Sequence, residues 1–448
     1  MATILEEFAA GIGRPAEDRD GLLAGHLLDT LGAWLAGLRT EDSHLIAGLV
    51  AAGASHPAAL DGGLLDRIAL RVAQIRNTEI DDIHMGSCTT PGSVVVPVAL
   101  SLVAALGTAD AARFARGLAA GYAAMNRLSL AVSGATILYR GVWPTYFTAP
   151  FGAAATSSAL LGLDAAATAD ALAIALTLTS GTPGGHSEAS PRWILLGQAA
   201  RAGVFAALAA AKGYHGDRSL LDGDWLQRTH GIACESAPLR DAAAAGDIAA
   251  VSFKPYCCAK QGAAALDGFR QLMTDLSPDE ITAVRIAVPP AYAGMIGHGN
   301  AAKGRVERIT SAPYQMALAA YRPDMLDDVL RPDLTREPKI AAFLPRVSVA
   351  PDPALAPLFP ARYPARVEIA LKDGRTLTKL VTDATGDPGT GFSEPQLRQK
   401  FRRLAAPAIE HDAAEDLARS ALAATKSDQS LGALSQAVEG RFALSPGT

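Results

Sequence analysis

Apolar residues recur every three to four positions along most of the first 265 residues. Between Asp20 and Gly37 the stripe consists of Leu22, Leu23, Leu27, Leu28, Leu31, Trp34 and Leu35. Such spacing places apolar side chains on one face of an α-helix, and glycine and proline interrupt the pattern between segments. We predict helices over Asp20–Gly37, Leu65–Ile75, Val94–Leu106, Ala109–Met125, Gly152–Leu163, Asp164–Thr179 and Arg192–Gly213.

The pattern changes after about residue 265. Glu280–Val288 alternates between apolar and polar residues, as do Tyr363–Ala370 and Arg375–Val381, and this period of two is typical of strands. Asp373-Gly374 lies between the last two segments and predicts a hairpin turn. The intervening and following segments return to helical spacing, near Ser311–Tyr321, near Met325–Leu330 and from about residue 395 onward.

These patterns predict a protein that is mostly α with a second α+β domain. We expect an all-helical domain over residues 1–265, completed by a C-terminal helical return over residues 396–448. A smaller α+β lid domain is expected over residues 266–395. The abundance of alanine supports this reading, because alanine loses no side-chain entropy on entering a helix.

Composition excludes several classes of protein. Of the 448 residues, 49% are hydrophobic and 19% are charged, which is too apolar for a disordered chain. The net charge of −5 does not provide the excess of positive charge that is typical of nucleic-acid-binding proteins. Glu6 and Glu7 stand where a signal peptide would be basic, and the long apolar runs are interrupted by charges or prolines. We therefore expect a soluble, cytoplasmic protein with neither nucleic acid nor membrane as a partner.

Cysteine usage predicts no disulfide framework and no structural metal. Only four cysteines are present, two of them adjacent at Cys257 and Cys258, and none has the spacing of a zinc site. Adjacent thiols also do not reach opposite faces of one carbon, so buried, inert cysteines are the favoured interpretation.

Several motifs occur in a fixed order along nearly the whole chain: Asn77–Pro97, Gly141–Gly162, Arg192–Gly213, Phe253–Asp267, Ser311–Ala320, Asp373-Gly374-Arg375 with Gly386-Asp387-Pro388, and Gln399-Lys400-Phe401. Together they resemble the MmgE/PrpD family, which includes 2-methylcitrate dehydratase, cis-aconitate decarboxylase and iminodisuccinate epimerase. The resemblance implies a helical plus α+β architecture, a homodimer, and catalysis without metal or organic cofactor.

The family's catalytic positions are only partly kept. Thr90 precedes Pro91 where the dehydratase and decarboxylase branches have a histidine, and Trp143 replaces the histidine of a Gly-Phe-His motif. Arg192 stands where the family has a lysine, whereas two functional positions are retained, at Lys254 and Tyr314. Dehydration and decarboxylation need a delivered proton, which histidine supplies near its natural pKa and which Thr and Trp cannot supply. A different proton-transfer reaction is therefore expected.

Four residues are candidates for the acid and base: Tyr146, His84, Lys254 and Tyr314. A tyrosine beside a cation is expected to have a lowered pKa because the cation stabilises the phenolate. His84 follows Asp82 by two residues, and a carboxylate near an imidazole raises its basicity. The alternatives are core tyrosines with hydrogen-bonded hydroxyls and an ordinary loop histidine.

Substrate binding is assigned to a set of cations and polar groups. Arginine and lysine suit a small di- or polycarboxylate, and the alternative for each is a surface ion pair. Of the adjacent carboxylates Asp81 and Asp82, one is expected to orient a partner or cap a helix. Six other histidines, His26 among them, are expected to be surface or capping residues. The candidate binding residues are Arg192, Arg140, Asp82, Thr90, Trp143 and, as part of a lid, His298.

Three functions remain open. The first is a cofactor-independent epimerase of the iminodisuccinate type, which inverts a carbon alpha to a carboxylate and needs no departing group. The second is a dehydratase or decarboxylase of the 2-methylcitrate or cis-aconitate type. The third is a non-catalytic carboxylate-binding protein on the same fold.

Overall fold

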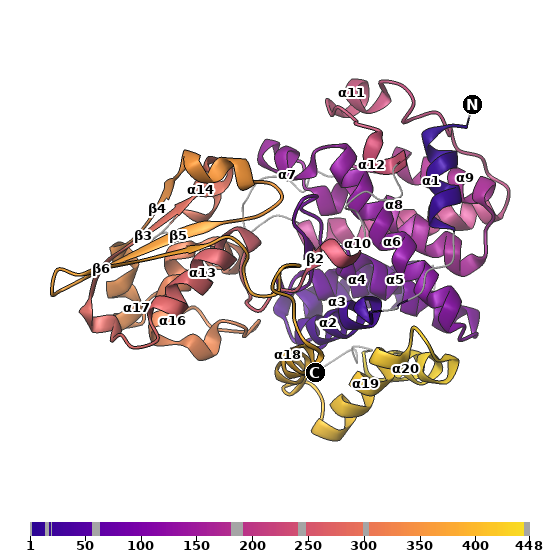
Figure 1. Cartoon of the computed structure of the whole chain (residues 1–448). Coiled ribbons are helices and arrows are strands. Elements are labelled where there is room, and N and C mark those ends of the chain that lie inside the picture. The colour runs from indigo at the N-terminus through magenta and orange to yellow at the C-terminus, as the bar shows by residue number, and fades with distance from the viewer. Residues whose placement is uncertain are drawn as a thin grey trace. The chain divides into compact units, whose positions relative to one another are not determined.

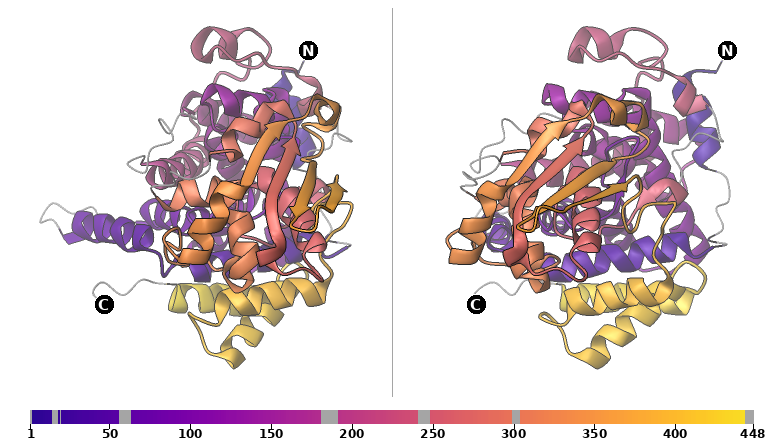
Figure 2. Two further views of the ribbon diagram at one scale, coloured as in Figure 1. Left: turned by 90° about the vertical axis from the view of Figure 1, so that its left-hand side faces the viewer. Right: turned by 60° about the vertical axis from the view of Figure 1, so that its left-hand side comes forward.

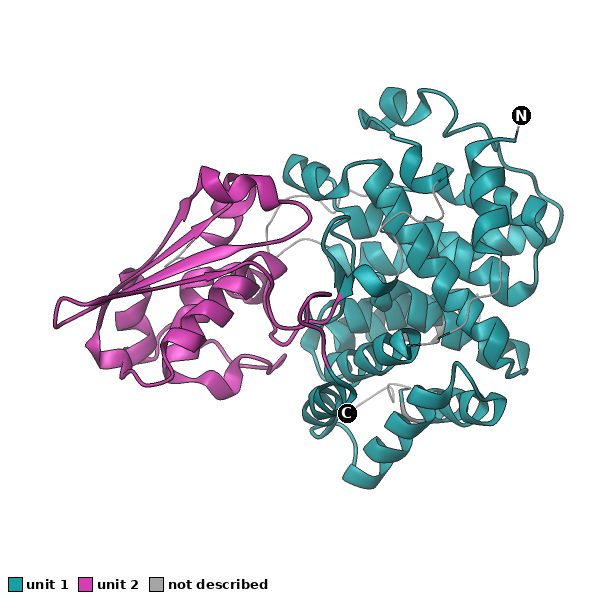
Figure 3. Ribbon diagram, viewed as in Figure 1, with its two compact units in different colours: residues 1–185, 190–251, 393–448 teal, residues 186–189, 252–392 magenta. Residues whose placement is uncertain are grey.

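The computed structural model describes residues 2–13, 18, 20–55, 63–180, 191–240, 248–298 and 304–442. The chain forms two compact units (Figure 3): residues 1–185, 190–251 and 393–448 make up the first, and residues 186–189 and 252–392 the second. The predicted fold class, mostly α with a second α+β domain, is confirmed.

The first unit is helical (Figure 1). Its helices in chain order are α1 (Ile4–Ile12), α2 (Leu22–Gly37), α3 (Glu41–Ser55), α4 (Leu64–Arg76), α5 (Gly92–Leu106), α6 (Ala111–Ala131), α7 (Gly134–Ile137), η1 (Leu138–Arg140), α8 (Pro144–Leu161), α9 (Ala165–Thr177), α10 (Arg192–Ala211), α11 (Trp225–His230), α12 (Ala237–Arg240) and η2 (Ile248–Ala250). The short strand β1 (Ile83–His84) lies between α4 and α5, and β2 (Val251–Ser252) lies at the division between the units.

Helix α8 is the centre of the first unit and packs against α5, α6, α9 and α10. Small residues permit this crowding. A Cβ at Gly152 would lie 2.2 Å from Met125 Cγ of α6, and one at Gly203 would lie 2.1 Å from the carbonyl oxygen of Pro150. Glycine at these contacts lets the helix backbones approach closely, as the alanine-rich composition also does.

Helix α8 begins earlier than the sequence predicts. Pro144, not Gly152, is its first residue, and the helix continues through Pro150. Proline suits the first helical turn because its missing N–H would have no intrahelical partner there. The prediction was wrong because Pro150 looked like a break. As a result, Thr145 and Tyr146 lie on the first turn of a buried helix.

Helix α10 is, among the described residues, the one helix long and apolar enough to cross a membrane by length and composition. It packs against α4, α8 and α9, as a central helix of a globular unit does. Length and composition alone are weak evidence for a membrane span.

The C-terminal return consists of α18 (Glu394–Ala405), α19 (His411–Ala423) and α20 (Asp428–Arg441). Helices α18 and α19 pack against α2, and α20 packs against α5. The end of the chain therefore completes the core that the N-terminal helices begin.

The second unit contains a four-stranded sheet with the order β4-β3-β5-β6, and Figure 2 shows its strands side by side. Strand β3 (Ile281–Val288) pairs in parallel with β4 (Val347–Pro351) and antiparallel with β5 (Ala365–Leu371). Strands β5 and β6 (Thr376–Val381) form the predicted hairpin, with Gly374 at φ +86° in the turn. Strand β4 was not predicted.

Helices alternate with these strands along the chain. They are α13 (Lys260–Leu272), η3 (Pro278–Glu280), α14 (Pro290–Ile296), α15 (Arg305–Thr310), α16 (Ala312–Tyr321), η4 (Pro323–Met325), α17 (Pro338–Phe343), η5 (Leu344–Arg346) and η6 (Pro353–Leu358). Strand β5 alternates buried and half-buried residues, and α13 packs against β5 and β6. The predicted helix over Met325–Leu330 was wrong beyond Met325, because the Asp328 carboxylate accepts a hydrogen bond from the backbone N–H of Leu330 and favours a turn there.

The structure divides the chain earlier than the predicted boundaries at residues 265 and 396. The divisions fall after residues 251 and 392, so the first predicted boundary lies inside α13. The alanine-rich sequence of α13 resembles the preceding helical region, but the helix packs on the sheet of the second unit.

Candidate functional site

The segment between α4 and α5 is polar and yet buried. Apart from Gly86, every residue from Asn77 to Gly92 is buried. Glu79 and Cys88 have φ values of +58° and +56°, which non-glycine residues rarely adopt. Strained backbone of this kind concentrates at functional sites, because the surroundings must hold it in place. This segment is therefore the first element of the candidate site.

The adjacent carboxylates of Asp81 and Asp82 point to different partners. Asp81 Oδ1 accepts a 3.2 Å hydrogen bond from Arg76 Nη1. Asp82 Oδ1 accepts from the backbone N–H of Gly92 at 2.9 Å, and Oδ2 accepts from the Tyr122 hydroxyl at 2.7 Å. Asp82 thus caps the start of α5, as expected of one of the pair, and its contacts are those of a positioning residue.

The prediction that His26 is a surface or capping residue was wrong. The side chain is buried in α2, and its Nδ1 lies 2.9 Å from Asp82 Oδ2. The rings of His26 and Tyr122 are 5.7 Å apart between centroids. Burial and the charge of Asp82 raise the pKa of Tyr122 well above its usual range, so its hydroxyl remains a donor. In the sequence, the position of His26 within the apolar run of α2 was the one indication that this side chain is buried.

Arg76, a buried arginine that no sequence motif singles out, holds two carboxylates, those of Glu79 and Asp81. Arg76 Nη1 lies 2.8 Å from Glu79 Oε2 as well as 3.2 Å from Asp81. Burial would lower the pKa of Arg76, but the two carboxylates outweigh it and raise it. The guanidinium also lies 5.8 Å from the centroid of the Trp193 ring. This arrangement fixes a cation at the end of α4.

Tyr146 lies on the first turn of α8 with 3% of its surface exposed. Its ring packs edge-on against Trp143 at a centroid distance of 6.0 Å. Within the described part of the chain, the hydroxyl has no hydrogen-bond partner. Burial raises the pKa of Tyr146, although the charges of Arg76 and Arg192 oppose this effect. The expectation of a lowered pKa was therefore wrong, and the hydroxyl is protonated at neutral pH.

Arg192 is the first residue of α10 and is also almost fully buried. Its guanidinium lies 4.8 Å from the ring centroid of Trp143 and 5.6 Å from that of Trp193. Such stacking holds the planar group in place. Across the described residues, the guanidinium has no carboxylate partner. A buried cation of this kind is stabilised by an anion, so Arg192, Tyr146 and Trp143 form a candidate anion site.

Thr90 connects the two buried segments. Its backbone N–H donates to Thr145 Oγ1 at 3.0 Å, and the two hydroxyls lie 3.2 Å apart. Because Thr145 precedes Tyr146, this contact ties the start of α8 to the segment after β1. Thr90 is therefore placed beside the candidate site through the backbone.

His84 is buried in a chain of hydroxyl groups. Its Nδ1 lies 2.8 Å from Ser87 Oγ, which lies 2.6 Å from Thr89 Oγ1. Thr89 Oγ1 donates to Asn126 Oδ1 at 2.7 Å.

Arg140, in contrast, is exposed, and its Nη2 donates to the carbonyl oxygen of Gly231 at 3.0 Å. Arg140 thus has the contact of a surface residue that fastens a neighbouring loop.

Three predicted residues lie in the second unit. Lys254 and Tyr314 are buried, and the Tyr314 hydroxyl accepts a 3.4 Å hydrogen bond from the backbone N–H of Leu334. Burial raises the pKa of Tyr314. His298 is exposed and lies 3.0 Å from both the carbonyl oxygen of Glu307 and Thr310 Oγ1, within its own unit.

The retained motifs of this unit also have structural partners. The Lys260 ammonium forms a buried ion pair with Asp387 of the Gly-Asp-Pro motif. Burial raises the pKa of Cys258 to about 12, against the opposing charge of Lys254. The thiol is therefore protonated at neutral pH, which agrees with the interpretation of an inert cysteine.

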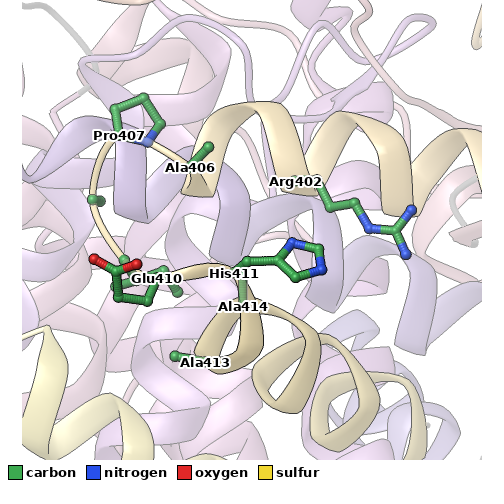
Figure 4. Close-up of a pocket in the computed structure, with 9 residues that line it drawn as sticks. Arg402, Ala406, Pro407, Glu410, His411, Ala413 and Ala414 are labelled. Atoms are coloured by element: carbon green, nitrogen blue, oxygen red, sulfur yellow. The ribbon is translucent and has the colours of Figure 1, made fainter.

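A pocket of about 770 Å³ lies at the turn between α18 and α19 (Figure 4). Its ionisable side chains do not converge: in the close-up, Glu410 points away from His411, and Arg402 is ion-paired with Glu415. This pocket contains none of the predicted site residues. Among the described residues, no group of three or more His, Cys, Asp or Glu side chains is placed to hold a metal ion.

Two family models match the chain. The MmgE/PrpD N-terminal domain matches residues 23–229, and the MmgE/PrpD C-terminal domain matches residues 256–424. The division after residue 251 falls between the two matches. A stretch of 156 residues is 33% identical to the cis-aconitate decarboxylase-like protein oryM of Aspergillus oryzae, and it covers 33% of this chain and 32% of that relative. The aligned stretch thus spans about a third of the relative's length.

Proposed function

The chain belongs to the MmgE/PrpD family of enzymes, and we propose that it catalyses proton transfer at a carbon alpha to a carboxylate of a small polycarboxylate. The specific reaction that we propose is epimerisation of the iminodisuccinate type, in the cytoplasm and without cofactor. The observation that carries the proposal is the buried guanidinium of Arg192 beside the Tyr146 hydroxyl.

Arg192 supports an anionic substrate. The guanidinium is stacked against Trp143 and Trp193, and within the described residues no carboxylate neutralises it. Arginine binds carboxylates through two parallel hydrogen bonds, and the interaction is stronger away from water. A substrate carboxylate is the group that would complete this site.

The side chains at positions 90 and 143 favour epimerisation over dehydration or decarboxylation, in which the substrate loses water or CO2. Thr90 and Trp143 carry no group that titrates near neutral pH, and Thr90 is already bonded to Thr145. Epimerisation removes one proton from the alpha carbon and returns one to the opposite face, so atoms balance without a departing group. Nearby cations stabilise the enolate-like charge between the two steps. We propose that the base on one face of the carbon and the acid on the other face are among His84, Lys254 and Tyr314.

The proposal is tested by hydrogen exchange at the alpha carbon. Stereopure iminodisuccinate is incubated with the full-length protein in D2O, and the alpha-proton signal and optical rotation are followed by NMR and polarimetry. We expect deuterium incorporation together with loss of rotation. The variant Arg192→Gln should lose this activity, whereas Arg228→Gln, a side chain 70% exposed in the same unit, should keep it. Absence of exchange in the wild type would contradict epimerisation.

The relative from Aspergillus oryzae favours a second candidate, a decarboxylase or dehydratase of cis-aconitate or 2-methylcitrate. Release of CO2 or loss of water from these acids by the wild type would support it. The double variant Thr90→His and Trp143→His is the second arm of this test. Activity that appears only in the double variant would show that replacement of these two side chains separates this chain from the decarboxylase branch.

A further inference from the structure

We infer that the Tyr146 hydroxyl donates a hydrogen bond to a carboxylate oxygen of the ligand beside Arg192, and that Tyr146 is a specificity-determining residue and not the base. This inference rests on the proposed polycarboxylate substrate. It assigns to one side chain of the first unit a defined contact with that substrate.

The position of the hydroxyl is fixed by packing. Pro144 begins α8, and the Thr90–Thr145 contact of 3.0 Å holds its first turn. The ring of Tyr146 is buried and packs against Trp143, over which the Arg192 guanidinium is stacked at 4.8 Å. One tryptophan therefore contacts both the phenol and the cation. The hydroxyl cannot turn to water, because rotation of the ring leaves the oxygen on the same axis.

The Tyr146 hydroxyl lacks the kind of hydrogen-bond partner that other buried tyrosines of this protein have. Two other buried tyrosines of this protein donate their hydroxyl protons to carboxylates, Tyr122 to Asp82 and Tyr256 to Asp267, each at 2.7 Å. The Tyr256 hydroxyl also accepts a 2.6 Å hydrogen bond from an arginine, Arg270. Tyr146 also has arginines nearby, but among the described residues its hydroxyl has no hydrogen-bond partner. A buried hydroxyl without a partner is unfavourable, and a ligand carboxylate would remove that penalty.

The protonation state of the Tyr146 phenol makes it a donor. Burial raises the pKa of Tyr146, and the charges of Arg76 and Arg192 oppose this effect without reversing it. The nearby carboxylates of Glu79 and Asp81 reinforce the increase. The phenol therefore keeps its proton at neutral pH and acts as a donor, which excludes it as a base for an alpha proton. A neutral donor beside a fixed guanidinium favours an anionic acceptor over a neutral one.

The test removes only the hydroxyl. Binding of citrate, succinate and the neutral analogue succinamide to the full-length protein is measured by calorimetry, in the wild type and in Tyr146→Phe. We expect the wild type to bind at least one of the acids and to discriminate against succinamide. A hydrogen bond to a charged group corresponds to a loss of affinity of roughly 10- to 100-fold in the variant. Tyr214→Phe, at a side chain 70% exposed, is the matched control and should bind as the wild type does.

Thermal unfolding of the ligand-free proteins separates a binding role from a structural one. Because the hydroxyl has no partner in the described structure, Tyr146→Phe should unfold at the wild-type temperature or above it. A clear decrease in Tm would show that the hydroxyl has a structural partner and would overturn the inference.

Two further outcomes are decisive. Unchanged affinity of Tyr146→Phe for the acids would overturn the inference and leave the proposed substrate class intact. If the wild type binds none of the acids, the proposed substrate class fails, and the inference fails with it.

The double variant Tyr146→Phe with Arg192→Gln is a further test. The losses of binding free energy in the two single variants should not add up in the double variant, because both groups bind one carboxylate. Strict additivity would show that they do not share it.

Discussion

The ammonium group of Lys400 lies 2.6 Å from Oδ1 of Asp29, and both side chains are almost completely buried. The two residues are 371 positions apart in the sequence. Lys400 Nζ also donates a 2.9 Å hydrogen bond to the carbonyl oxygen of Ile80, directly before the two adjacent aspartates. One lysine of the C-terminal return thus joins α18 to α2 and to the buried segment of the candidate site.

Replacing Lys400 by methionine should destabilise the protein strongly. The substitution keeps much of the side-chain volume but leaves the Asp29 charge buried without its partner. Breaking a buried pair in this way lowers the free energy of unfolding by about 3–5 kcal/mol. Urea unfolding monitored by circular dichroism measures the change. The control is Arg398→Gln on the same helix, whose partly exposed pair with Glu394 should contribute less than about 1 kcal/mol.

The effect of Lys400→Met should depend on pH. Burial raises the pKa of Asp29 above its ordinary 3.8, and the charge of Lys400 opposes this effect. Without Lys400 the folded-state pKa rises further, so the folded protein takes up a proton that the unfolded chain does not bind until a lower pH. The variant therefore recovers stability relative to the wild type as the pH falls from neutral toward 3.8. A difference between the two proteins that grows in acid would contradict this assignment.

Tyr122→Phe should lower stability, in contrast to the same change at Tyr146. Asp82 loses the 2.7 Å hydrogen bond from the Tyr122 hydroxyl while it remains buried. Removing one partner from a buried carboxylate lowers the free energy of unfolding by about 1–3 kcal/mol. Denaturant unfolding of both variants provides a direct comparison between chemically identical substitutions. Equal stability of the two would show that the partners of these hydroxyls do not differ.

Gly92→Ala should disturb the start of α5. A Cβ at this position would lie 2.6 Å from Thr30 Oγ1 and 2.8 Å from Asp82 Oδ1, and both contacts are too short. Crowding a packed interior in this way lowers the free energy of unfolding by about 1–3 kcal/mol. Gly48→Ala is the control, because Gly48 is at an exposed position of α3 and a Cβ there meets nothing within 4 Å. It should raise stability by about 0.5–1 kcal/mol, since alanine is the better helix former. Thermal unfolding should therefore move in opposite directions for the two variants.

Much of the fold follows from the period of the apolar residues. The period of 3.6 located α2, α4, α5, α6, α9 and α10 but not α1 or α3. The period of two with Asp373-Gly374 located the hairpin of β5 and β6. The sequence did not predict β4, because five residues ending in Pro351 are too short to show a period. Nor did it place the division correctly, since the composition of α13 does not show which neighbours the helix packs against.

The candidate site was predicted only where its residues lie within motifs. Tyr146 and Arg192 were found in this way, and Arg192 stays a prediction as a substrate contact. The pKa of Tyr146 was predicted with the wrong sign, because a sequence shows the neighbouring cations but not the burial that outweighs them. The partners of Asp82 and Asp29 lie 40 and 371 positions away, so no local pattern reveals them.

The homodimer that the family resemblance implies stays a prediction, and the mass of the protein in solution tests it. One chain has a mass of 46.2 kDa. We expect light scattering coupled to gel filtration to give about twice that mass at low micromolar concentration, because closed two-fold dimers are the commonest assemblies of soluble proteins. The outer face of α10 does not by itself mark the interface, because Arg201, which is ion-paired with Asp66, lies between the exposed side chains of Ile194 and Phe205. A wild type with the mass of a single chain would contradict the prediction of a homodimer.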